Sequence, residues 1–193
     1  MAALRLHRWV PFSRANGPGY RAVIWVQGCT LGCPGCGNPA THPRKGGYLI
    51  EPRALVEKIA SYSRQIEGVT ISGGEPLQQK KPLLEFLGLL RTQTNLSVIL
   101  FTGYSWAEVI KMREKRTLFS LIDVIIAGRY DQGQRLAKDL QGSANKTFHF
   151  LTRRYSQRDF QDILPAEILI TSQGEIVFTG IDPLGLSDCS KAR

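Results

Sequence analysis

Three cysteines lie close together near the start of the chain, in the stretch VQGCTLGCPGCGNPATH. Three residues separate Cys29 from Cys33, and two residues separate Cys33 from Cys36. Thiolates at such spacing are ligands of zinc or of iron–sulfur clusters, so the stretch predicts a metal site. The fourth cysteine of the chain, Cys189, lies in the polar segment LSDCSKAR, and we expect it to be a free thiol rather than a ligand.

The incomplete ligand set leaves three interpretations of this loop. In the first, His42 completes a Cys3His zinc site, and in the second, Cys189 folds back to complete a four-cysteine cluster. In the third, the three thiolates hold a [4Fe–4S] cluster with one iron left open, as a catalytic metal requires. Glycine backbone approaches sulfide closely and donates amide hydrogen bonds to it, which favours a cluster in a loop that contains Gly28, Gly32, Gly35 and Gly37.

These residues need a framework, and the rest of the chain predicts alternating strands and helices. Five apolar runs are typical of strands that are buried on both faces: 21–26, 68–72, 96–102, 121–128 and 147–152. Three segments are predicted as helices: 51–64, 81–93 and 105–115. In the last of them Ser105 and Glu108 have the spacing of a capping box. Such alternation predicts a parallel sheet with helices packed outside it.

The fold class is therefore expected to be α/β. The chain has 193 residues, which is short for a complete eight-fold barrel of about 250 residues. We expect a partial, open β/α barrel of parallel strands with outer helices. Residues 166–180 differ, because two strand-like runs flank SQG and predict a C-terminal β-hairpin. One domain is expected over 1–193, with a core at about 8–152 and an extension at about 153–193.

Parallel α/β sheets carry their chemistry at the carboxyl ends of the strands. The unusual loops of this chain follow its predicted strands. The cysteine loop follows the first strand, SGGEP (72–76) the second, TGY (102–104) the third and GRYD (128–131) the fourth. We therefore expect all four loops at one rim of the sheet.

The C-x3-C-x2-C spacing together with SGGEP resembles the radical S-adenosylmethionine (SAM) superfamily. Within that superfamily, NGPGYRAVIWVQGC (16–29) is similar to the N-terminal signature of glycyl-radical-enzyme activases. CPGCGNP, TGYSWAEV and GSANK (142–146) resemble motifs of the activating protein of anaerobic ribonucleoside-triphosphate reductase. The resemblance covers about residues 8–152 and does not extend beyond about residue 165.

The resemblance implies a radical SAM oxidoreductase with two cofactors, a [4Fe–4S] cluster held by Cys29, Cys33 and Cys36, and SAM on the open iron. It implies that one electron splits SAM into methionine and a 5′-deoxyadenosyl radical, which abstracts hydrogen from the substrate. The residues expected to contact SAM are Ser72, Gly73, Gly74, Glu75, Thr102, Ser143 and Asn145. Thr, Ser and Asn are also common in ordinary turns, and no residue is assigned to catalysis.

Aromatic and imidazole side chains near these loops have plainer interpretations. Trp25 lies in a predicted strand and is expected in the core. Tyr104 follows the third strand, where we expect it either to stack on adenine or to pack in the core or at the rim. His42 and His149 are expected to be structural histidines rather than ligands.

An activase acts on a backbone glycine of a partner enzyme, so the resemblance implies a protein partner and a reductant such as flavodoxin or ferredoxin. Two features depart from the family. Ala127 stands where an acidic residue is expected before the glycine of GRYD, and the chain extends past a minimal activase. These departures suggest a partner of its own. The alternative is a small radical SAM enzyme that acts directly on a peptide or small molecule.

Composition adds a location and one further alternative. No apolar run reaches 18 residues and no signal-peptide pattern opens the chain, so we expect a cytoplasmic protein without a membrane partner. The formal charge is +9 at pH 7, and a zinc-stabilised module that binds nucleic acid is the remote alternative. That alternative leaves SGGEP unexplained. The basic run KMREKR (111–116) is interpreted as a solvated helix face.

Overall fold

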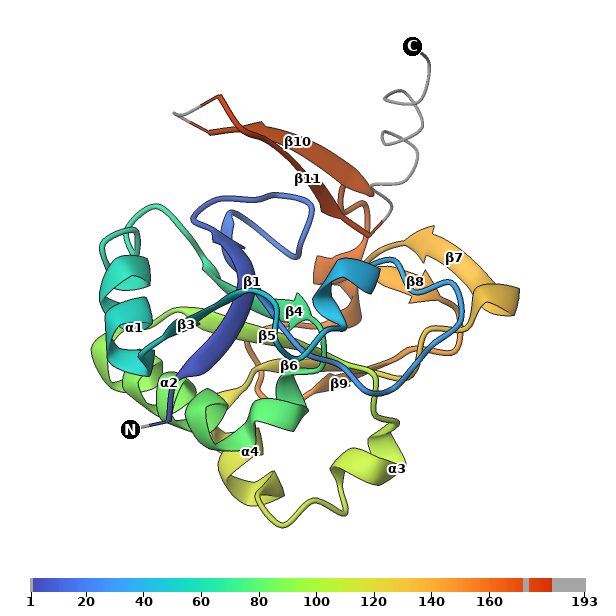
Figure 1. Cartoon of the computed structure of the whole chain (residues 1–193), viewed down its shortest axis with the longest axis horizontal. Coiled ribbons are helices and arrows are strands. Elements are labelled where there is room, and N and C mark those ends of the chain that lie inside the picture. Colours follow the sequence, from blue (N-terminus) through green and yellow to red (C-terminus); the bar gives the residue numbers. More distant parts are fainter. Residues whose placement is uncertain (1, 172–173, 182–193) are drawn as a thin grey trace.

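A seven-stranded sheet lies at the centre of the protein, with the strand order β3-β1-β2-β4-β5-β6-β9 (Figure 1). The computed structural model describes residues 2–171 and 174–181. The strands of the sheet are β1 (Leu4–Val10), β2 (Arg21–Val26), β3 (Tyr48–Ile50), β4 (Gly68–Gly73), β5 (Ser97–Thr102), β6 (Val124–Ala127) and β9 (Thr147–Phe150). Two ribbons stand beside it, β7 (Arg135–Lys138) with β8 (Gln141–Ser143), and β10 (Ala166–Ile170) with β11 (Ile176–Gly180).

Helices connect the strands of the sheet. The α-helices are α1 (Pro52–Ala60), α2 (Lys80–Gln93), α3 (Trp106–Val109) and α4 (Lys115–Leu121). Short 3-10 turns are η1 (Pro39–Thr41), η2 (Pro76–Gln79), η3 (Gln132–Gln134) and η4 (Gln157–Phe160). Helices predicted at 51–64 and 81–93 are confirmed as α1 and α2, the first with Pro52 at its first turn, where a missing N–H costs no hydrogen bond.

The four central strands are parallel, as the alternation of strands and helices predicted. β2 pairs with β4, β4 with β5, and β5 with β6, all in parallel register. Their residues are buried almost without interruption, because both faces of the sheet are covered. The mixed α/β fold with a mainly parallel central sheet is therefore confirmed, and the partial barrel stays a prediction.

One strand runs against the prediction. β9 was expected among the parallel strands, but it pairs antiparallel with β6. The connection from β6 to β9 contains the β7–β8 ribbon and the short turn η3 instead of an α-helix. A parallel neighbour needs a long crossover, usually helical, whereas an antiparallel neighbour needs none. The chain therefore returns along the adjacent strand in the opposite direction.

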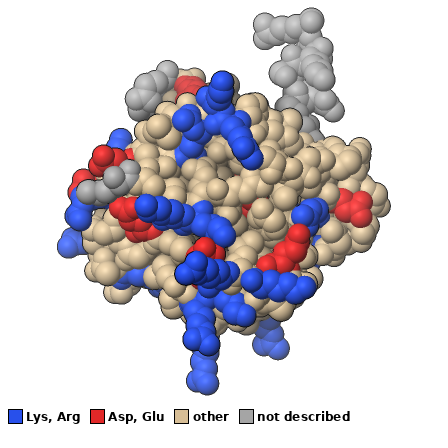
Figure 2. Space-filling view, turned by 60° about the horizontal axis from the view of Figure 1, so that its bottom comes forward, with Lys and Arg blue, Asp and Glu red and all other residues tan. Residues whose placement is uncertain are grey.

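The helix predicted at 105–115 is shorter than expected. Its capping box is confirmed, because the Glu108 backbone N–H donates to Ser105 Oγ at 3.3 Å and the Ser105 N–H donates to Glu108 Oε2 at 2.7 Å. The helix ends at Val109, however, and α4 begins only at Lys115. KMREKR has too few apolar residues to pack a continuous helix against the sheet. Figure 2 shows the side on which α3 and α4 lie, where Lys and Arg side chains predominate.

The strand β1 was missed by sequence analysis. Leu4, Leu6 and Val10 point into the core from this strand, and it pairs antiparallel with both β2 and β3. Apolar and polar residues alternate from Leu4 to His7, as they do in a half-buried strand, and this alternation was the available signal. The hairpin predicted at 166–180 is confirmed as β10–β11, and Cys189 lies outside the described residues.

Different elements cover the two faces of the sheet. On one face, α1, α2 and α4 bury residues such as Leu55, Phe86 and Leu118 against the strands. On the other face, Ile99 and Ile126 pack against the segment after β9, and the β10–β11 hairpin covers β1 and β2. Within the described residues, the α-helices therefore lie on one face, and the short turn η4 packs on the other through Phe160. Among the described residues, the helices are too short or too polar to cross a membrane.

Candidate functional site

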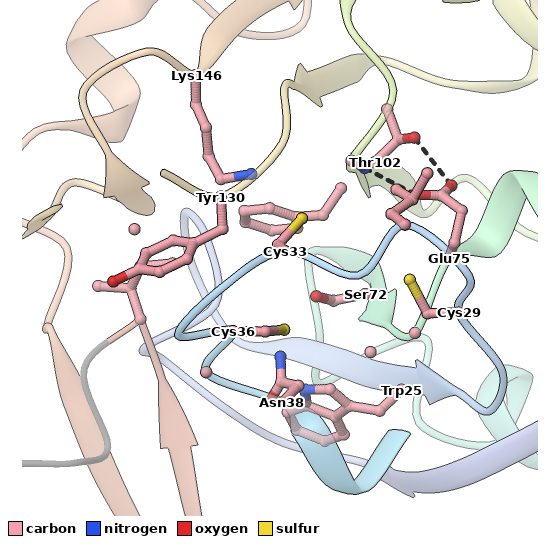
Figure 3. Close-up of a pocket in the computed structure, with 18 of the residues that line it drawn as sticks. Trp25, Cys29, Cys33, Cys36, Asn38, Ser72, Glu75, Thr102, Tyr130 and Lys146 are labelled. Atoms are coloured by element: carbon pink, nitrogen blue, oxygen red, sulfur yellow. Dashed lines mark hydrogen bonds between the residues drawn. The ribbon is translucent and has the colours of Figure 1, made fainter. Parts of the chain in front are cut away.

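A pocket opens at the carboxyl ends of the parallel strands, and all three loop cysteines line it (Figure 3). The rim expected from the sequence is therefore present. The end of β2 leads into the cysteine loop, and the ends of β4 and β5 supply Ser72 and Thr102. The lining also includes Trp25, Asn38, His42, Gly73, Gly74, Glu75, Phe101, Tyr130, Leu140 and Lys146.

Backbone hydrogen bonds fasten the cysteine loop to the rim. The Gly28 N–H donates to the Thr41 carbonyl at 2.7 Å, and the Cys29 N–H donates to the His42 carbonyl at 3.1 Å. Gln27 closes the base of the loop, because its amide nitrogen donates to the Pro43 carbonyl at 2.8 Å. These bonds hold Cys29 at the end of β2, although Cys29 itself lies in neither a helix nor a strand.

The two glycines of SGGEP are required by close packing of backbone. A Cβ on Gly73 would lie 2.5 Å from the Val26 nitrogen, and a Cβ on Gly74 would lie 2.4 Å from the Gly28 oxygen. Gly73 also has φ of +102°, which favours glycine. The Gly74 N–H donates to the Val26 carbonyl at 2.8 Å. The end of β4 is thereby bonded to the strand that leads into the cysteine loop.

The three thiols suit a cluster better than a single ion. Cys29, Cys33 and Cys36 are half-buried, and their sulfur atoms face the same cavity (Figure 3). Within residues 2–171 and 174–181, no three side chains of His, Cys, Asp or Glu converge on the position of one ion. Zinc needs its ligands around one ion, whereas a cubane cluster spreads its thiolates over separate irons. The donor set therefore fits the cluster and disfavours a Cys3His zinc site with His42.

Burial affects the first thiol most clearly. Desolvation raises the pKa of Cys29, and the negative charges of Glu75, Cys33 and Cys36 raise it further. A hydrogen bond from the Leu31 backbone opposes this effect. The site therefore stabilises the neutral thiol in the absence of a cation, and binding of a metal would have to displace that proton.

Glu75 joins the ends of two strands. Its Oε1 accepts hydrogen bonds from Thr102 Oγ1 at 2.8 Å and from the Leu77 N–H at 2.9 Å, and its Oε2 accepts from the Gly103 N–H at 2.7 Å. Burial raises the pKa of Glu75, although these three hydrogen bonds lower it. The carboxylate lines the pocket while it holds the β4 and β5 loops together.

Lys146 is a site residue that sequence analysis missed. It is half-buried, lines the pocket, and donates from Nζ to the Gly128 carbonyl at 2.6 Å. Desolvation lowers the pKa of Lys146, whereas the nearby charges of Cys33, Glu75 and Cys36 raise it. GSANK was noted in the sequence, but a lysine in a polar loop gives no sign that it will line a pocket. Its position opposite three thiols comes only from the fold.

Ser143 and Asn145 are not among the residues that line the pocket. Ser143 is fully buried and accepts a hydrogen bond from the Asp131 N–H at 3.2 Å. Asn145 is exposed, and its side-chain amide donates to the Arg129 carbonyl at 2.9 Å. Both side chains brace the loop after β6. Direct contact of either residue with SAM stays a prediction.

Aromatic residues are distributed differently from the sequence interpretation. Trp25 was expected in the core, but it is only partly buried and lines the pocket beside Ser72, its partner on β4. Tyr130 also lines the pocket, whereas Tyr104 contacts a separate groove. His149 stacks on Trp106 with ring centroids 3.7 Å apart, which agrees with a structural role.

A known family matches a region of the chain that contains most of the central sheet. The profile described as "4Fe-4S single cluster domain" matches residues 15–149. That range contains the cysteine loop, the carboxyl ends of β2, β4, β5 and β6, and Lys146. The β10–β11 hairpin lies beyond it.

Several curated relatives of this chain are named as activating enzymes or activating proteins. The anaerobic ribonucleoside-triphosphate reductase-activating protein of Enterobacteria phage T4 is 29% identical over 143 residues, which is 72% of this chain and 89% of that protein. The pyruvate formate-lyase-activating enzyme of Clostridium pasteurianum is 32% identical over 124 residues, covering 62% and 52%. A Haemophilus influenzae protein named among the glycyl-radical enzyme activating enzymes is 42% identical over 90 residues, covering 46% and 34%. The chain thus spans about half or less of the last two.

Proposed function

Because this chain belongs to the 4Fe-4S single cluster domain family, we propose that it is a radical SAM activase that installs a glycyl radical on a partner enzyme. The observation that carries the proposal is one pocket that joins three half-buried thiols, two strand-end glycines and a half-buried lysine. The names of the relatives support the same function. In this proposal the chain forms a single radical SAM domain.

Each part of the rim has a role in this proposal. Cys29, Cys33 and Cys36 would hold a [4Fe–4S] cluster, and Gly73 and Gly74 would present backbone to the methionine end of SAM. When bound and reduced, the cluster would supply one electron for the cleavage of SAM. Lys146 offsets the negative charge that three thiolates bring into a site of low dielectric constant.

Other residues shape the pocket rather than take part in bond cleavage. Glu75 and Thr102 hold the ends of β4 and β5 at a fixed separation through their 2.8 Å hydrogen bond. Trp25 and Tyr130 give the pocket apolar walls. Such walls exclude water, which strengthens electrostatic interactions and limits side reactions of a reactive species.

The substrate in this proposal is a backbone glycine on a loop of a partner protein. A small chain suffices, because the partner completes the pocket while its glycine is inside. We further propose a reducing compartment such as the cytoplasm, since the three free thiols remain reduced there. The β10–β11 hairpin borders the pocket through Gly180 and Ile181, where an entering loop would pass.

The decisive experiment reconstitutes the protein anaerobically with iron and sulfide, then supplies SAM and dithionite. We expect a brown protein that releases 5′-deoxyadenosine. The Cys33→Ala variant should lose both the visible absorbance and the cleavage, whereas Cys189→Ala should keep both. A colourless protein without SAM cleavage would contradict the radical SAM assignment.

A second step tests the activase assignment. The reconstituted protein is incubated with SAM, dithionite and the glycyl-radical enzyme encoded nearest to its gene, and electron paramagnetic resonance measures the glycyl radical. The expected result is a radical signal that needs both proteins and SAM. SAM cleavage without any glycyl radical would instead favour direct action on a peptide or small molecule.

A further inference from the structure

The cysteine loop has a second exposed side. Gly28 and Thr30, the neighbours of Cys29, line an open groove that none of the loop cysteines lines. The groove is bounded by the start of β1, by η2 and by the turn between α3 and α4. Thr30 is tied to this side, because its N–H donates to Gln78 Oε1 at 3.2 Å and its hydroxyl accepts from Gln78 Nε2 at 2.8 Å.

Positive charge lines this groove. Arg5, Arg44 and Lys80 contribute to its walls. Lys80 pairs with Glu114 at 3.1 Å, whereas Arg5 donates to the Gly46 carbonyl at 3.1 Å. In the described part of the chain, neither Arg5 nor Arg44 forms an ion pair with a carboxylate. An anionic surface placed here would therefore meet uncompensated cations.

The basic run KMREKR extends this charge beyond the groove. It occupies the turn between α3 and α4 and the start of α4, so its cations stand around Met112, which lines the groove. Lys111, Arg113 and Lys115 are exposed. Figure 2 faces the side of α3 and α4, where blue side chains project from the surface. We call the groove with these three residues the basic face.

We propose that the basic face is the docking surface for an acidic one-electron carrier protein that reduces the cluster. This inference rests on the proposed function, because only a reductively activated enzyme needs such a partner. The thiol-lined pocket is reserved for SAM and the substrate glycine. The basic face instead contacts the peptide around Cys29 from a side that the thiols do not line, so a carrier bound there reaches the backbone of the cysteine loop while the pocket stays closed.

The composition of the basic face suits a transient redox complex. Leu49, which is 59% exposed, together with Met112 and Tyr104 supplies a small apolar centre within a cationic surround. Weak electron-transfer complexes have small interfaces. Complementary charge raises their association rate rather than their lifetime, and this rate falls with ionic strength.

The test compares two charge reversals of equal size. The test variant Lys111→Glu/Arg113→Glu alters the basic face, and the control Arg153→Glu/Arg158→Glu alters exposed cations after β9. Reduced flavodoxin and reduced ferredoxin, both acidic, are the probes. Stopped-flow absorbance measures how fast each probe bleaches the reconstituted cluster without SAM, at low and high salt. Dithionite is the small reductant that bypasses docking.

We expect the test variant to slow bleaching by at least one probe about tenfold at low salt, with dithionite rates unchanged and the control like the wild type. Slowing by both variants alike, or no slowing by either, would overturn the proposal. A third outcome is that neither carrier reduces the cluster, while the wild type binds a labelled DNA 20-mer and the test variant does not. That outcome would overturn the docking proposal in favour of a nucleic-acid partner. If a carrier bleaches the wild-type cluster but the protein does not cleave SAM, the proposed function is rejected, whereas the proposal of a docking surface is retained.

Discussion

Cationic side chains lie at both ends of the parallel sheet, yet their burial and their surroundings differ. At the amino ends, Arg21 is completely buried and makes six hydrogen bonds to Thr70, Ser97, Tyr155 and the carbonyls of Pro18, Val69 and Ser97. Tyr155 in turn donates to Glu67. Burial lowers the pKa of Arg21, while Tyr155 and Glu67 oppose that shift.

At the carboxyl ends, Lys146 is in a different situation. One hydrogen bond, to the Gly128 carbonyl, is formed by an ammonium group that has three donors. Its other neighbours include the thiols of Cys33 and Cys36, which face a pocket. A buried cation whose N–H donors are all hydrogen-bonded joins strands together, as Arg21 does. A cation that keeps spare N–H donors beside a pocket, as Lys146 does, is available to a ligand. Burial and pKa direction alone do not separate the two cases.

The largest effect on stability is expected at the amino end. Replacing Arg21 by Met removes the common donor of six hydrogen bonds, so buried oxygens on Thr70 and Ser97 lose a partner. We expect a loss of about 3 kcal/mol in the free energy of unfolding, measured by denaturant titration. Exposed Arg64→Met should change it by less than about 0.5 kcal/mol. A loss at Arg21 as small as that at Arg64 would show that the hydrogen-bond network is not structural.

Next in size is a change at the rim itself. Gly74→Ala places a Cβ 2.4 Å from the Gly28 oxygen, which should cost about 2 kcal/mol and reduce the iron content after reconstitution. Gly88→Ala is the matched control, because no atom lies within 4 Å of its Cβ and helix propensity should stabilise α2 by about 1 kcal/mol. Equal iron content in both variants would show that the rim tolerates a methyl group at position 74.

Lys146→Met tests the carboxyl end with little change in volume. We expect the reduction potential of the reconstituted cluster to become more negative, because a cation that favours added electrons is gone. The measurement is a redox titration followed by electron paramagnetic resonance. An unchanged potential would place the charge of Lys146 outside the influence of the cluster.

The same variant has a defined pH signature. Because burial lowers the folded pKa of Lys146 below 10.5, the unfolded chain binds more protons between the two pKa values. Wild-type stability should therefore rise relative to Lys146→Met as pH increases through this window. Parallel pH profiles for the two proteins would contradict a lowered pKa of Lys146 in the folded protein.

The smallest effect is expected at the surface near the rim. Arg129 and Ser105 lower the pKa of Glu108 from 4.5 to about 2. Its stabilising contribution is present above pH 4.5 and is lost as the pH falls through about 2. Arg129→Gln should raise this pKa, as measured by NMR titration, with a stability cost below about 1 kcal/mol because the pair is exposed. A pKa that remains near 2 would assign the shift to Ser105 alone.

Much of the framework could be predicted from local patterns. The four parallel strands, α1, α2, the capping box and the terminal hairpin follow from apolar periodicity and turn residues. Errors occurred where local pattern was weak or misleading. Sequence analysis overlooked β1 and gave β9 the wrong direction. It also extended the predicted helix into KMREKR, whereas α3 ends at Val109. Strand direction depends on the connection between strands, which a single apolar run does not encode.

The sequence by itself determined the type of ligand, because three closely spaced cysteines predict a metal site. The cluster and SAM were implied by the resemblance of C-x3-C-x2-C and SGGEP to a known family. Only the tertiary structure decided which residues share the pocket. It brought in Trp25, Tyr130 and Lys146, and it left Ser143, Asn145 and Tyr104 outside the lining. The physical reason is that burial and proximity are set by the pairing of distant strands, whereas ligand type is carried by the side chain itself.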